Sequence, residues 1–357
     1  MSSAIASALP IGPSFAHLCR LSTAKGVFEH CDGLMPRPEC GYCTDDVARA
    51  LVAVAREPTG TGGDERTLAA LARAYLAFLV EAYRGSGRFA NRRHLGGRWL
   101  DGDAFDPFGD DGMADASGRA LWALGEASVG LADPGQRRLA REVFDEACRF
   151  RSPWLRSTAF AVLGAGTVAA ADPSNVGAAL LLADAAELVA ARTVGLGRPD
   201  WAWPEPRLSY ANAVLPEMLL VLGRELRLDT FVEEGLRQLA WLAEVETAPG
   251  GWLSLTPVGG WGPGEPRPGF DQQPIEAATL ADACATAWTL TRDTSWIDLL
   301  VRCGDWFLGH NDSATAMVDV HSGAGFDGLT PLGRNGNCGA ESTIAAITTL
   351  QWARLVA

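Results

Sequence analysis

Apolar residues recur at three- and four-residue intervals along most of the chain, in segments separated by breaks rich in Gly, Pro and polar residues. This period predicts α-helices. In the segment 64–83, for example, Leu68, Leu71, Tyr75 and Phe78 share one face and charged residues occupy the other. Apolar and polar residues alternate over no more than a few positions anywhere, so the pattern does not favour a sheet.

The predicted helices form a repeating series of pairs. The first helix of most pairs is apolar nearly all round, which is typical of a buried helix, and the second is amphipathic, which is typical of a helix that covers it. Buried and covering helices repeated about six times predict an all-α fold, an (α/α)6 toroid, in a single domain over 1–357. The predicted ranges are 13–24, 45–57, 64–83, 115–130, a charged helix ending near 150, 153–170, 173–193, 210–227, 229–246, 272–291, 295–308 and 339–355.

In such a toroid all inner helices begin at the same end, where the long loops also gather. The predicted inner helices begin near Asp45, Asp115, Pro153, Tyr210, Gln272 and Gly339. Acidic residues in a first helical turn are favoured by the free N–H groups there, which is sufficient explanation for any one of them. Six polar helix starts that meet at one end of the ring, around a shared opening that we call the funnel, favour a common functional site over six separate helix caps.

Composition and charge exclude several classes of protein. The chain has 357 residues, 48% hydrophobic, and a formal net charge of −13, which argues against nucleic-acid binding. No apolar run is long enough to span a membrane. The segment 1–10 lacks the basic and hydrophobic regions of a signal peptide. Eight cysteines in a chain of this length are not a disulfide scaffold, so we expect a cytoplasmic protein with reduced thiols.

One cysteine group raises the question of a metal. Cys40 and Cys43 have the C-x-x-C spacing of a zinc ligand pair, and His30 and Cys31 are the nearest residues that would complete it. The second half has irregular spacing and no other C-x-x-C exists, so loop thiols are favoured over a metal site. Phosphate-loop and dinucleotide fingerprints are also missing, and we expect no cofactor.

The loops at the funnel end are rich in Trp, Asp, Asn and Gly, which suits a carbohydrate. Aromatic faces stack on sugar rings, and amides and carboxylates bond hydroxyls, although loop tryptophans also serve as packing anchors. The apolar helices also carry arginines, for which ion pairing is favoured over substrate contact. The predicted substrate-binding residues are Arg49, Arg119, Trp203, Tyr210, Asn212, Trp261, Asp271, Gln272, Gln273, Glu276 and Asn337.

Glycoside hydrolysis needs a protonated carboxylic acid and a second carboxylate. The predicted catalytic residues are Asp45, Asp46, Glu205 and Glu341. Glu205 lies between two prolines near Trp203, a setting that would raise its pKa toward that of a general acid. The other three lie at helix starts, where the ionised form is favoured, so they would act as bases or hydroxyl ligands.

Four stretches together resemble a known family: GYCTDDVARAL at 41–51, GRALWALG at 118–125, DQQPIEA at 271–277 and GAEST at 339–343. They are similar to a bacterial family of six-hairpin glycosidase-like proteins, found alone or fused to glycosyltransferase domains. The resemblance implies an α/α toroid, a carbohydrate substrate and a functional link to a glycosyltransferase. The segment 114–117 departs from the more acidic or His-containing start that the family leads us to expect.

Three functions follow as hypotheses. The leading one is a glycoside hydrolase, or a closely related sugar-processing enzyme, that acts on an oligosaccharide or glycoconjugate by carboxylate acid/base catalysis. The second is a sugar isomerase or epimerase on a similar toroid. That chemistry wants a His that acts on a ring-opened sugar, and the predicted inner helices have none there. The third is a non-catalytic carbohydrate-binding partner of a glycosyltransferase.

Overall fold

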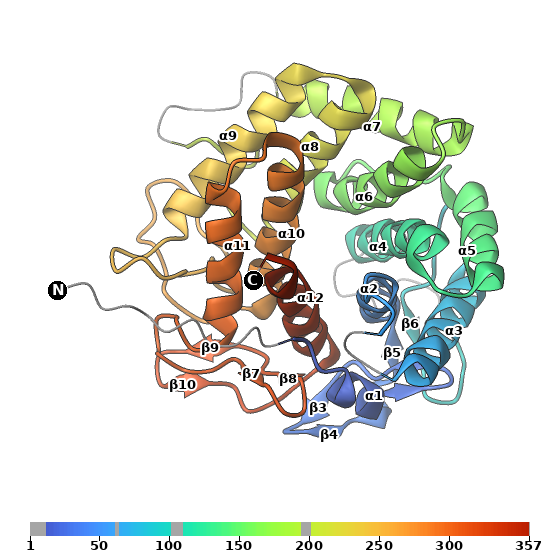
Figure 1. Cartoon of the computed structure of the whole chain (residues 1–357), viewed down its shortest axis with the longest axis horizontal. Coiled ribbons are helices and arrows are strands. Elements are labelled where there is room, and N and C mark those ends of the chain that lie inside the picture. Colours follow the sequence, from blue (N-terminus) through green and yellow to red (C-terminus); the bar gives the residue numbers. More distant parts are fainter. Residues whose placement is uncertain (1–11, 61–63, 101–109, 194–200, 357) are drawn as a thin grey trace.

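The chain folds into two concentric rings of helices, as its computed structural model shows for residues 12–60, 64–100, 110–193 and 201–356 (Figure 1). The inner helices are α2 (Thr44–Ala55), α4 (Asp110–Gly130), α6 (Leu155–Ala171), α8 (Val214–Leu226), α10 (Pro274–Thr291) and α12 (Ala340–Val356). The outer helices are α3 (Glu65–Ala82), α5 (Pro134–Ala147), α7 (Val176–Thr193), α9 (Asp229–Val245) and α11 (Ser295–Phe307). The predicted all-α toroid is confirmed.

Each inner helix packs against the next, and α12 packs against α2, which closes the ring. The short helix α1 (Ala16–Leu21) contacts α12, the inner helix that has no outer partner after it. The inner helices are buried as their sequences predict: all residues of α6 from Leu155 to Gly166 are buried. The apolar composition of these helices therefore reflects their place between the funnel and the outer ring.

Helices α4 and α6 approach each other closely because glycines face each other at the crossing. A Cβ on Gly125 would lie 2.4 Å from the carbonyl oxygen of Gly164, and a Cβ on Gly164 would lie 2.3 Å from that of Leu121. Real Cβ atoms do not come this close, so side chains at these two positions would push the helices apart.

Within the described residues, five short antiparallel strand pairs accompany the helices. Each strand has only two residues, too few for any alternation in the sequence to predict it. The first pair ends α1 at Leu21, so the predicted helix 13–24 is shorter than expected. The pairs are β1 (Ser22–Thr23) with β2 (Gly26–Val27), β3 (Cys31–Asp32) with β4 (Met35–Pro36), β5 (Tyr42–Cys43) with β6 (Arg92–Arg93), β7 (Val318–Asp319) with β8 (Ala324–Gly325), and β9 (Leu329–Thr330) with β10 (Gly333–Arg334).

Two inner helices begin four or five residues from their predicted starts. Helix α4 begins at Asp110 instead of near Asp115, so Asp115 lies inside the helix; residues 101–109 before it are outside the described residues. Helix α8 begins at Val214 instead of Tyr210, because Ala211 has a φ of +45° that no α-helix accommodates. Tyr210 is consequently a loop residue.

A layer of charged and polar side chains crosses the interior of the ring. Arg56, at the C-terminal end of α2, donates to Asp282 of α10 at 2.6 Å and to Glu126 of α4 at 3.3 Å. Trp122 of α4 and Trp352 of α12 flank its guanidinium at 5.2 and 5.5 Å from their ring centroids. The remaining two inner helices join the layer: Thr167 of α6 donates to Glu126, and Glu217 of α8 accepts from Thr286 of α10.

Candidate functional site

A pocket of about 620 Å³ lies where the inner helices begin. The structure brings seven of the predicted site residues to its wall. They are Asp45, Asp46 and Glu341 from the catalytic set, and Arg49, Arg119, Tyr210 and Gln273 from the binding set. A volume of this size is ordinary for a small-molecule site and holds a sugar of one to a few residues.

Arg49 joins two of the predicted catalytic carboxyl groups. Its Nη2 donates to Oδ1 of Asp46 at 2.8 Å, and its Nη1 donates to Oε2 of Glu341 at 2.5 Å. The side chain of Glu341 is 38% exposed and that of Asp46 is 4% exposed. One guanidinium therefore holds an accessible carboxylate and a buried carboxyl group side by side.

The surroundings move the pKa values of these two groups in opposite directions. Burial, and then the neighbouring carboxylates Glu29 and Glu341, raise the pKa of Asp46 to about 7 against the attraction of Arg49. Burial alone would raise the pKa of Glu341, but Arg49 and Arg119 outweigh it and lower that pKa below its ordinary value. At neutral pH Glu341 is ionised, and Asp46 is protonated in a large fraction of molecules.

Asp45 lies on the other side of the helix start. Its Oδ1 is 3.3 Å from Nε of Arg119, and its Oδ2 accepts from the Cys43 thiol at 3.4 Å. Burial raises the pKa of Asp45, partly offset by Arg119. Arg119 itself is fixed over the ring of Phe160, 3.9 Å from the ring centroid. Asp45 is therefore a second carboxyl group of the pocket whose pKa burial raises.

Some pocket residues were missed by the sequence reasoning. They are Glu29, His30, Asn91, Arg92, Asp115 and Asp327. Glu29, His30, Asn91 and Arg92 come from hairpins and loops with no helical period, so no pattern placed them. Asp115 carries a sequence signal, since the pattern predicts a helix start there, but its segment is less acidic than the family resemblance leads us to expect.

Three predicted residues do not line the pocket but lie behind its wall: Glu205, Asn212 and Glu276. Glu205 accepts from Nη1 of Arg156 through both carboxylate oxygens, each at 2.6 Å. Glu276 is buried and accepts from the backbone N–H of Ala211 at 2.6 Å and from that of Asn212 at 3.1 Å. Burial raises the pKa of Glu276 to about 8. The proline-flanked setting of Glu205 thus serves an ion pair.

The predicted tryptophans, Trp203 and Trp261, belong to a cluster that also contains Trp201 and Trp241. Trp203 is buried and its ring stacks on Trp241 with centroids 5.9 Å apart. Trp261 packs edge-on to Trp201, with centroids 5.2 Å apart. Neither Trp203 nor Trp261 is among the residues that line the pocket. This arrangement matches the packing-anchor interpretation of these loops.

The last predicted residues also lie off the pocket wall. Asp271 is exposed at the surface. Gln272 is buried, where its side chain bonds the backbone of Leu255 and the side chain of Asp312. Asn337 accepts from the backbone N–H of Gly33 at 3.0 Å. Gln272 and Asn337 tie loops to one another, and that function explains amides at both positions.

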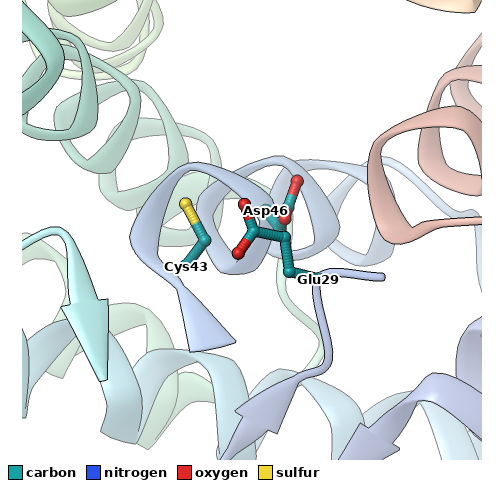
Figure 2. A group of neighbouring side chains, drawn as sticks. All are labelled: Glu29, Cys43 and Asp46. Atoms are coloured by element: carbon teal, nitrogen blue, oxygen red, sulfur yellow. The ribbon is translucent and has the colours of Figure 1, made fainter. Parts of the chain in front are cut away.

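One group of pocket residues has metal-ligand atoms close together. Glu29, Cys43 and Asp46 place one such atom each within 4.8 Å of one another, and Figure 2 shows them around the start of α2. Arg92 pairs with Glu29 and Arg49 pairs with Asp46. Burial raises the pKa of the Cys43 thiol, which disfavours the thiolate. Because two arginines already pair with the carboxylates and the thiol is protonated, this group is poorly suited to bind a metal ion. Cys31, Cys40 and His30 do not belong to this group.

Solved structures similar to this one share its fold at low sequence identity. A sugar epimerase from a ruminal bacterium is 10% identical with a TM-score of 0.68, over 96% of this chain and 94% of that chain. A cellobiose 2-epimerase from Bacillus thermoamylovorans is 9% identical with a TM-score of 0.68, over 96% of both chains. A cellulase of C. cellulolyticum in complex with cellobiose is 10% identical with a TM-score of 0.61, over 93% of this chain and 88% of that chain.

Neither a protein-family model nor a curated relative matches the sequence. At about 10% identity the structural likeness shows the fold alone, and that fold is the α/α toroid that the four sequence stretches led us to expect. Among the helices that the structure describes, none is long and apolar enough to cross a membrane.

Proposed function

We propose that this protein is a glycoside hydrolase that acts on an oligosaccharide or glycoconjugate by carboxylate acid/base catalysis. The observation that carries the proposal is the pair of carboxyl groups on Arg49, whose pKa values are pushed apart: about 7 for Asp46 and below its ordinary value for Glu341. Two carboxyl groups with separated pKa values are the arrangement that acid/base catalysis requires.

In this proposal Glu341 is the base or nucleophile, because it is ionised and more than a third exposed to the pocket. The proton donor is Asp45 or Asp46, because burial raises the pKa values of both carboxyl groups. The named activities of the structural neighbours, sugar epimerases and a cellulase, support a carbohydrate as the substrate.

The test is hydrolysis of a panel of aryl glycosides and neutral oligosaccharides by wild-type protein and by Glu341→Gln. We expect release of the aryl group or of a reducing end by wild type on at least one substrate, and its loss in the variant. Equal turnover by both proteins would rule out this role of Glu341. Asp45→Asn and Asp46→Asn are measured separately to identify the proton donor. The variant that has lost the donor is expected to recover turnover on aryl glycosides whose leaving group needs no proton.

A second candidate is a sugar epimerase, favoured by the two epimerase neighbours with TM-scores of 0.68. Epimerisation moves a proton on carbon, and the described pocket wall offers one imidazole, His30, whose side chain is 55% exposed. Incubation of cellobiose in D₂O distinguishes the two functions. Deuterium in an intact disaccharide indicates epimerisation, whereas two monosaccharides indicate hydrolysis.

A third candidate is a carbohydrate-binding partner of a glycosyltransferase. The ion pairs of Arg49 with Asp46 and Glu341 favour this function. Carboxylates that stay paired with Arg49 can hydrogen-bond a sugar without taking part in a reaction. Sugar binding in calorimetry together with no turnover across the whole panel would support this function.

A further inference from the structure

Tyr210 is the aromatic ring that the pocket presents to a ligand. Among the described residues that line the pocket it alone carries a benzene ring, and 41% of the residue is exposed. An exposed aromatic on a loop ordinarily samples several rotamers. Tyr210 is instead held at its hydroxyl, its ring and its backbone.

The hydroxyl of Tyr210 donates to Oδ2 of Asp115 at 2.5 Å. Asp115 is in turn fixed from α6, because Oγ of Ser157 donates to its Oδ1 at 2.5 Å. The ring thus bridges from the loop before α8 to the second turn of α4.

Arg156 of α6 holds the other end of the residue. Its Nε donates to the carbonyl oxygen of Tyr210 at 2.6 Å, and its guanidinium lies 5.1 Å from the centroid of the Tyr210 ring. It also donates through Nη2 to Oδ1 of Asn212 at 3.1 Å. Arg156 is buried, so it supports the ring from behind and leaves the exposed part of the ring to the pocket.

Two residues that the sequence predicted as part of the site, and that lie off the pocket wall, complete this support. Glu205 neutralises Arg156 with both carboxylate oxygens. Glu276 fixes the backbone N–H groups of Ala211 and Asn212. Every residue from Ser209 to Asn212 therefore has a backbone atom bonded to a side chain behind the pocket.

We propose that Tyr210 is a preorganised platform on which a pyranose ring of the substrate stacks, and that Arg156 is the positioning residue that holds the platform. The proposal rests on the carbohydrate substrate of the proposed function and names a binding subsite within it. A ring fixed before binding loses little conformational entropy when the sugar arrives, and an aromatic face matches the C–H face of a pyranose.

The experiment is calorimetric titration of cellobiose, mannobiose, chitobiose and maltose into protein carrying Glu341→Gln, which leaves the sugar uncut. In this background we expect Tyr210→Ala to raise the Kd of whichever sugar binds by about tenfold, the contribution of one aromatic face. Tyr210→Phe keeps the ring and is expected to stay within about threefold. Trp154→Ala is the matched control, because Trp154 is 45% exposed but does not line the pocket.

Arg156→Lys tests the positioning role, because an ammonium cannot make the several directed bonds of the guanidinium. Alone it is expected to weaken binding about as much as Tyr210→Ala, and to have no further effect in the Tyr210→Ala protein. Equal losses in both backgrounds would overturn the positioning role. If Arg156→Lys does not fold, Glu205→Gln takes its place in the same cycle, since it weakens the grip on Arg156 and keeps Arg156 itself.

Two results would contradict the proposal that Tyr210 is a sugar-binding platform: unchanged sugar affinity in Tyr210→Ala, or no binding of any sugar in the panel. Evidence against the hydrolase function would look different from both. Wild-type protein that binds a sugar through Tyr210 without cleaving it would end the hydrolase proposal and leave the platform in place.

Discussion

Arg49 and Glu341, 292 residues apart in the sequence, are joined by a hydrogen bond of 2.5 Å between Nη1 and Oε2. The bond ties α2, the first inner helix, to α12, the last, so the ring closes across the pocket. The same guanidinium sets the pKa of the carboxylate that we propose as the base. One side chain consequently contributes both to the contact between α2 and α12 and to the proposed catalytic pair.

Glu341→Gln is expected to lower kcat by about 10²–10⁴-fold, the usual loss when a positioned acid/base group is removed. The fold is expected to remain, because the side chain is partly exposed and Gln keeps an acceptor for Arg49. Steady-state kinetics on the best glycoside and a thermal melt check both statements. Gln273→Ala, which changes the wall of the same pocket without a carboxyl group, is the control.

If Asp46 is the acid, the wild-type pH profile is expected to fall as the pH rises through about 7, because Asp46 has to be protonated to donate and its pKa is about 7. On the acid side the profile is expected to fall only below the ordinary range of Glu, since the pKa of Glu341 is lowered. The measurement is kcat/KM between pH 3 and pH 9. A flat profile through pH 7 would contradict the role of Asp46.

Arg49→Gln is expected to move both limbs of that profile to higher pH. Arg49 lowers the pKa values of Asp46 and Glu341, so both rise when its charge is removed. Arg207→Gln is the matched control, because Arg207 pairs with Glu265 at the surface, with both side chains 46% exposed. A shift of only one limb would show that Arg49 governs only one of the two carboxyl groups.

Arg56→Leu is expected to destabilise the protein by about 3–5 kcal/mol, because it leaves Asp282 and Glu126 without their partner inside the ring. Breaking the exposed pair of Arg207 with Glu265 is expected to cost about 0–1 kcal/mol. Urea unfolding of Arg56→Leu and Arg207→Leu measures the difference. Similar midpoints for the two variants would contradict a structural role of the inner layer.

Gly125→Ala is expected to destabilise the protein by about 1–3 kcal/mol, even though Ala is the better helix former, because its Cβ meets the carbonyl of Gly164 at 2.4 Å. Gly336→Ala, where a new Cβ meets nothing within 4 Å, is the control and is expected to be neutral. Thermal melts of both variants compare them. A neutral Gly125→Ala would mean that α4 and α6 separate without loss.

The fold followed from the sequence because most inner helices are apolar nearly all round and most outer helices are amphipathic, a contrast that residue types display directly. The convergence of Asp45, Asp46 and Glu341 followed from topology alone, since inner helices of a toroid begin at one end. The positions of Glu29 and Asp327 in the pocket could not be predicted, because both lie in loops or hairpins whose course leaves no periodic pattern of apolar residues in the sequence.

Glu205 and Tyr210 illustrate the remaining gap. The sequence marked both, but their three-dimensional arrangement gives them different tasks: Glu205 balances a buried guanidinium, and Tyr210 faces the pocket. The deciding residue is Arg156, on a helix that reads as apolar, and its partners come from segments about 50 residues away. Pairings of this kind are set by the packing of α6 against the loop before α8, which local patterns do not record.

The polar layer around Arg56 also bears on how a ligand reaches the pocket. Side chains from all six inner helices meet in this layer, on the far side of the pocket within the described part of the chain. If the proposed hydrolase function holds, we expect substrate and product to enter and leave at the same end of the ring. The product would then compete with substrate for the pocket, so we expect it to be a competitive inhibitor.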